Sequence, residues 1–86
     1  MAEDWRPAIR ALTYCIQFSP DPTRQQSVDH VIKTVVNQGA LGRDRDYYRA
    51  SVASALASNE TLSNLIPQDH PEEVIRRFLE LVLARL

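Results

Sequence analysis

The sequence predicts an all-α fold, a compact bundle of five short helices in a death-like or antiparallel arrangement. Apolar residues recur at intervals of three and four along most of the chain, which is the spacing that lines one face of a helix. Asp-Pro, Gly and His-Pro signals divide this pattern into short segments. The 86 residues suffice for one modest core. We therefore expect a single helical domain over 1–86, the N-terminal module of a longer protein.

The first helix is expected to begin at Asp4, its N-cap, and to run to about Phe18, with Pro7 in the first turn. At 100° per residue, Tyr14 and Phe18 fall on the side opposite the core stripe. This helix is therefore either central in the bundle or apolar on its outer face. The core stripe consists of Trp5, Ile9, Leu12 and Ile16.

The second helix is expected to have Asp21 as its cap and Pro22 at its first position, and to end at Gly39 in a left-handed conformation. A second break follows at Gly42, and a turn between Gly39 and Asp46 would add a sixth helix. The buried stripe of the second helix consists of Val28, Val31, Ile32, Val35 and Val36.

Three further helices follow from the same signals. The third begins near Asp44, a short fourth is capped by Ser58 or Asn59 and stops at Pro67, and the last has Pro71 at its first position. Their stripes are Tyr48, Val52, Ala55 and Leu56, then Leu62, Leu65 and Ile66, then Ile75, Phe78, Leu79, Val82 and Leu86. Two acidic residues in the last helix, Glu72 and Glu73, stand four positions before Arg76 and Arg77, which predicts ion pairs on an exposed face.

The charge balance argues against several classes of partner. Ten Lys plus Arg stand against eleven Asp plus Glu, a net charge of -1, so no field attracts nucleic acid or an anionic membrane. No apolar run approaches the ~20 residues that span a bilayer. The lone Cys15 cannot form an internal disulfide and the start of the chain lacks an apolar leader, so we expect a cytoplasmic protein.

The chain shows no catalytic or cofactor-binding set. One Cys and two scattered His, His30 and His70, cannot build a zinc site. The stretch from Gly39 to Gly42 lacks the Gly-Lys-Ser/Thr sequence of a phosphate loop. Cys15 lies mid-helix, where a small buried apolar role is expected. We therefore expect a non-enzyme with no cofactor, metal or small-molecule substrate.

The best interface candidate is a run of alternating charges beside two tyrosines, at the start of the third helix. Tyr and Arg are the residue types most often found at interface hot spots, and a mixed-sign patch can complement a second copy of itself. The alternative is a solvated helix start with local ion pairs. The predicted partner-binding residues are Arg43, Asp44, Arg45, Asp46, Tyr47 and Arg49, together with Tyr14 and Phe18.

Three motifs in the C-terminal part of the chain carry a family resemblance. They are Tyr48-x3-Val52-x2-Ala55-Leu56, Asn59-x2-Leu62-x2-Leu65-Ile66 and Pro71-Glu72-Glu73-x2-Arg76-x-Phe78-Leu79. The segment from Tyr48 to Leu86 resembles the effector-associated and death-like adaptor domains of bacterial defence proteases and NTPases. The resemblance implies a non-catalytic adaptor that joins a sensor to an effector by like-with-like helical packing. The partner is then another protein or the chain itself, in a closed oligomer or a filament.

Two rival functions remain. A toxin-binding immunity or antitoxin protein has similar length and helical content, but an inhibitor of a basic nuclease is expected to carry an acidic face. A small DNA-binding domain is disfavoured because the arginines alternate with aspartates.

Overall fold

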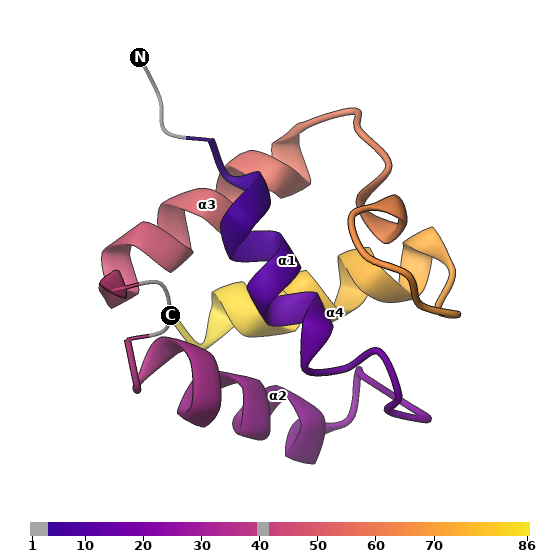
Figure 1. Cartoon of the computed structure of the whole chain (residues 1–86), viewed down its shortest axis with the longest axis horizontal. Coiled ribbons are helices and arrows are strands. Elements are labelled where there is room, and N and C mark those ends of the chain that lie inside the picture. The colour runs from indigo at the N-terminus through magenta and orange to yellow at the C-terminus, as the bar shows by residue number, and fades with distance from the viewer. Residues whose placement is uncertain (1–3, 40–41) are drawn as a thin grey trace.

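The computed structural model describes residues 4–39 and 42–86, and within them it contains helices and turns but no strand. The all-α prediction is therefore confirmed. In Figure 1, α1 crosses in front of α3 and α4, while α2 runs along the lower side of the molecule. The elements are α1 (Arg6–Tyr14), α2 (Gln25–Val31), the π-helix η1 (Ile32–Val36), α3 (Arg45–Ala57), the 3-10 turn η3 (Leu62–Asn64) and α4 (Glu72–Ala84).

One hydrophobic core joins the four α-helices found in the described residues, with Tyr48 and Phe78 as its largest fully buried side chains. The predicted stripes face this core as expected except at Ile66, which is half-buried and does not belong to it. Trp5, Leu56 and Leu86 are half-buried and pack against its edge. The buried apolar residues are Ala8, Ile9, Leu12, Ile16, Val28, Val31, Ile32, Val35, Val36, Tyr48, Val52, Ala55, Leu62, Ile75, Phe78, Leu79 and Val82.

The first helix is shorter than the sequence predicted, since α1 ends at Tyr14 and not near Phe18. The chain continues as hydrogen-bonded turns in which each amide reaches back three residues, as from Ile16 to Thr13 and from Ser19 to Ile16. The Thr13 hydroxyl donates to the Ile9 carbonyl at 2.7 Å, a side-chain bond that competes with regular helix geometry. At the other end, Asp4 accepts the Arg6 amide at 3.0 Å, although the N-cap position itself belongs to Trp5.

The predicted start of the second helix is wrong, because α2 begins at Gln25 with Arg24 as its N-cap. Asp21 instead accepts the amide and the hydroxyl of Thr23, at 3.1 and 2.6 Å, and so forms a local turn ahead of the helix. The predicted end is confirmed in part. The last helical residue is Val36 in η1, and Gly39 follows in the left-handed region at φ +67°.

The predicted sixth helix would lie in the link from Gly39 to Asp46. Ala40 and Leu41 lie outside the described residues, while Gly42 has φ +66° and donates its amide to the Gly39 carbonyl at 2.8 Å. The third helix begins near Asp44 as predicted, since α3 starts at Arg45 and Asp44 is its N-cap, accepting the Tyr47 amide at 3.0 Å.

The prediction of a fourth helix is wrong, because the structure has the single 3-10 turn η3 in its place. Two amides at this turn, those of Leu62 and Ser63, donate to the carboxylate of Glu72 at 3.0 and 2.7 Å. Because a side chain of α4 satisfies them, the segment needs no helix of its own. The last helix begins one residue later than predicted, with Pro71 as N-cap and Glu72 as its first residue.

The predicted ion pair between Glu72 and Arg76 forms, but its expected place on an exposed face is wrong. Their side chains are only 32% and 27% exposed, and the Arg76 Nε lies 2.9 Å from Glu72 Oε2. Arg76 also donates to the carbonyls of Leu56, Ser58 and Glu60 at 2.8 to 3.2 Å. Partial burial raises the pKa of Glu72, but the hydrogen bonds from Leu62, Ser63 and Arg76 outweigh it and hold that pKa below its usual value. Through these bonds, the Glu72 and Arg76 pair stabilises the connection between α3 and α4.

Candidate interaction surfaces

The run of alternating charges lies at the start of α3 and is organised around Tyr47. The Arg43 guanidinium stacks over the Tyr47 ring at 4.2 Å, and the Tyr47 ring meets that of Tyr48 edge to face, with the centroids 5.2 Å apart. Tyr48 is fully buried, and this burial raises its pKa. Tyr47 is half-buried, so it presents only part of its ring to solvent.

Arg45 and Arg49 both bond to the end of α4. Arg45 donates to the Arg85 carbonyl at 2.6 Å and to the Asn37 side chain at 3.0 Å. Arg49 donates to the Leu86 carbonyl oxygen, with its Nε at 3.2 Å, and pairs with Asp46 at 3.0 Å. Cationic groups at a helix C-terminus are stabilising because they meet its unpaired carbonyls and its negative dipole end. These arginines therefore have a bonding role inside the domain.

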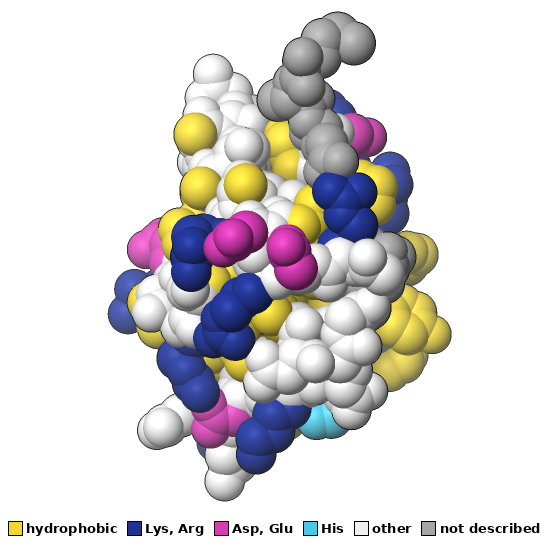
Figure 2. All heavy atoms as spheres, turned by 90° about the vertical axis from the view of Figure 1, so that its left-hand side faces the viewer, with side chains coloured by type: hydrophobic (Ala, Val, Ile, Leu, Met, Phe, Trp, Pro, Cys, Tyr) yellow, Lys and Arg dark blue, Asp and Glu magenta, His cyan; other side chains and the backbone are white. Residues whose placement is uncertain are grey.

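Figure 2 faces the side of the molecule on which α3 begins, and it shows basic and acidic side chains interleaved across that surface. Part of this patch borders the start of α1, since Asp4, Pro7, Arg43 and Tyr47 line one shallow hollow. The backbone amide of Arg6, followed by its side chain, lowers the pKa of Asp4 at the rim. The patch thus has mixed sign, as predicted, and adjoins one end of α1.

Tyr14 and Phe18 lie at the other end of α1. Tyr14 is 66% exposed and Phe18 is 91% exposed, and these two are the exposed large hydrophobic residues of the described chain. The predicted apolar outer side of the first helix is therefore at the surface. Because Tyr14 follows Pro7 by seven residues, and a helix rises 1.5 Å per residue, about 10 Å of helix separates the two predicted contact regions. The structure does not merge them into one patch.

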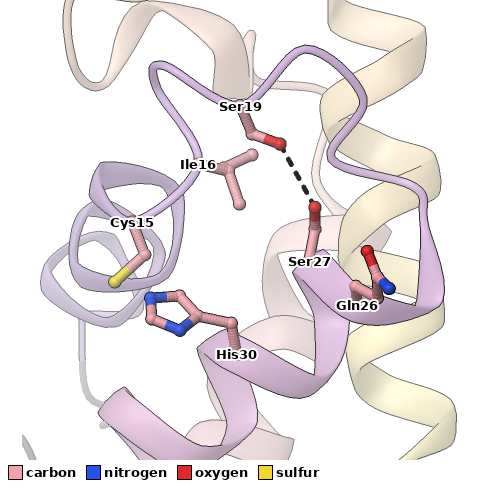
Figure 3. A pocket seen from close by; sticks show the side chains of 6 residues that line it. All are labelled: Cys15, Ile16, Ser19, Gln26, Ser27 and His30. Carbon is pink, nitrogen blue, oxygen red and sulfur yellow. Dashed lines mark hydrogen bonds between the residues drawn. The ribbon is translucent and has the colours of Figure 1, made fainter.

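A third surface feature joins α1 to α2. Cys15, Ile16, Ser19, Gln26, Ser27 and His30 line a hollow of about 200 Å³. Figure 3 shows the His30 ring and the Cys15 sulfur pointing toward each other across it, and Ser19 hydrogen-bonded to Ser27 at 3.1 Å. A nucleophilic thiol needs a lowered pKa, whereas burial raises the pKa of Cys15, and its Sγ lies 3.6 Å from the Ala11 carbonyl. Burial therefore disfavours the thiolate form of Cys15 in this hollow.

The described residues include no group of three or more His, Cys, Asp or Glu placed to hold a metal ion. Within the same residues, every helix is too short or too polar to cross a membrane. Comparison with protein-family models, with curated proteins and with solved structures found no match to this chain.

Sequence reasoning missed two features of these surfaces. One is the Cys15 and His30 hollow, whose members lie on different helices with no shared motif. The other is the contact of His70, whose ring Nε2 lies 3.1 Å from the Ile16 carbonyl at the end of α1. Both depend on how α1 packs on its neighbours, and residue spacing within one helix carries no signal of that.

Proposed function

We propose that this chain is a non-catalytic adaptor domain that associates with a protein partner, either another helical domain or a second copy of itself. The observation that supports the proposal most directly is the exposure of Tyr14 and Phe18. Exposed apolar groups beside polar surface mark interaction sites, and aromatic rings contribute large contact areas at low entropic cost. Such rings add nothing to the core of this domain.

The mixed-sign patch supports the same proposal in a secondary way. Asp46 and Arg49 present opposite charges at the surface, so a partner can be oriented by charge without a large net field. The sensor-to-effector role in bacterial defence rests on the sequence resemblance of Tyr48–Leu86, and the cytoplasmic location rests on the single reduced cysteine.

Photochemical crosslinking tests the proposal. Phe18 is replaced by a benzophenone-bearing phenylalanine in cells of the source organism, and Ala53, an exposed alanine of α3, receives the same group as the control. We expect light-dependent adducts from position 18, identified by mass spectrometry, and few from position 53. A Tyr14→Ser change should reduce the adducts. Equal or absent adducts from the two positions would show that the aromatic surface is not a protein contact.

A further inference from the structure

A second hollow, between the start of α2 and the end of α4, is suited to a large apolar side chain. Val28, Leu81 and Ala84 give it an apolar lining, here called the floor, and Thr23, Gln25 and Arg85 line it with polar groups, here called the rim. Its volume is about 250 Å³. An apolar cavity of about 150 Å³ already accepts benzene, so this hollow has room for a phenyl ring.

We infer that the Phe18 side chain of one copy of this chain occupies the α2/α4 hollow of a second copy. The inference deepens the proposed function and rests on it, because it names the partner and the contact. Phe18 is 91% exposed, so it does not fill the hollow of its own molecule. The same chain therefore presents an unburied ring and an apolar hollow with room for one.

No unpaired charge opposes this pairing. The segment from Tyr14 to Ser19 carries no charged side chain. On the other surface, the one charged residue at the rim, Arg85, is already paired with Asp29. Contact between the two therefore buries no unpaired charge, which is the usual penalty at such interfaces.

The rim also suits the second exposed aromatic residue. Gln25 and Arg85 carry side-chain N–H donors beside the apolar floor. The Tyr14 hydroxyl can accept from such a donor when Phe18 enters the hollow, since a tyrosine combines an apolar ring with a polar tip. The two hollows described above suit a phenyl ring less well, because imidazole, thiol and hydroxyl groups line one and Asp4 and Arg43 line the other.

The contact can be tested with two complementary variants. Phe18→Ser removes the ring, and Ala84→Glu places a carboxylate at the hollow. Both positions are exposed, so neither change disturbs the core. Ala53→Glu makes the same substitution on the exposed side of α3 and serves as the matched control. Association is measured by sedimentation velocity and by light scattering coupled to gel filtration, at rising concentration.

We expect the wild type and Ala53→Glu to self-associate alike, and each of the other two variants to do so about tenfold more weakly or less. A mixture of Phe18→Ser and Ala84→Glu should form a one-to-one dimer and nothing larger, because the mixture restores one intact contact. If the wild type is monomeric throughout, if the mixture fails to pair, or if either variant assembles like the wild type, the inference is wrong. Adducts to a different protein from position 18 would still support the adaptor proposal in that case.

Discussion

Two of the acid and arginine pairs of this domain look alike in sequence but differ in structure. Glu72 and Arg76 are about one third exposed and bond to five backbone groups of the connection between α3 and α4. Asp46 and Arg49 are 80% and 52% exposed, and only Arg49 reaches another element. The difference shows that the contribution of an ion pair to stability depends more on the backbone groups that it bonds to than on the sequence spacing of its charges.

The largest expected effect is at the half-buried pair. Arg76→Gln removes the donors to the carbonyls of Leu56, Ser58 and Glu60, and we expect the free energy of unfolding to fall by about 2 kcal/mol. Arg49→Gln, the matched change at the exposed pair, should lower it by about 0.5 kcal/mol. Urea denaturation followed by circular dichroism measures both. Equal losses would contradict the contrast between the two pairs.

Acid should separate the two pairs as well. The pKa of Glu72 is depressed in the folded state, so its stabilising contribution is complete above the unfolded value of 4.5 and is lost as the pH falls through the folded pKa. Below about pH 4.5, we expect the urea midpoint of the wild type to fall more steeply with decreasing pH than the midpoint of Glu72→Gln does. Asp46→Asn, at the exposed pair, is the control and should follow the wild type. If the urea midpoint of Glu72→Gln fell with pH as steeply as that of the wild type, Glu72 would not be the source of this pH dependence.

The smallest effect is expected where the patch meets the end of α4. The double change Arg45→Gln and Arg49→Gln removes both arginines from the last carbonyls of α4, and we expect a loss of about 0.5–1 kcal/mol. Fraying should be local. Amide exchange should therefore speed up in the last turn of α4 and remain unchanged at Ile75 and Val52 in the core. A uniform acceleration would show that these arginines support the whole bundle.

The sequence predicted the helices whose signals are local. The third helix begins next to Asp44 as expected, and the stripe of α4 from Ile75 to Val82 is fully buried. The helix bounds near Thr13 and Asp21 were wrong because these side chains bond to nearby groups in ways that hydrophobic spacing does not show.

The candidate surfaces were predictable to a different degree. Phe18 lies beyond the end of α1, so only the exposure of Tyr14 followed from helical geometry, as one of the two alternatives for that side of the helix. The α2/α4 hollow did not, since Val28 and Leu81 come together only through the packing of two helices distant in sequence. The same holds for Arg45 and Arg49, whose partners at Arg85 and Leu86 are 40 and 37 residues away.

The connection between α3 and α4 has a consequence for the order of folding. Two arginines contact Glu60 in this connection. Arg6, 54 positions away, pairs with its carboxylate, and Arg76, 16 positions away, donates to its backbone carbonyl. Arg6 can meet Glu60 only once α1 lies beside the connection, and Arg76 can do so only once α4 packs there, so we expect both contacts to form late in folding. We expect Arg76→Gln to raise the unfolding rate in stopped-flow experiments while leaving the folding rate nearly unchanged. The two arginines would then set the lifetime of the native state rather than the speed at which it is reached.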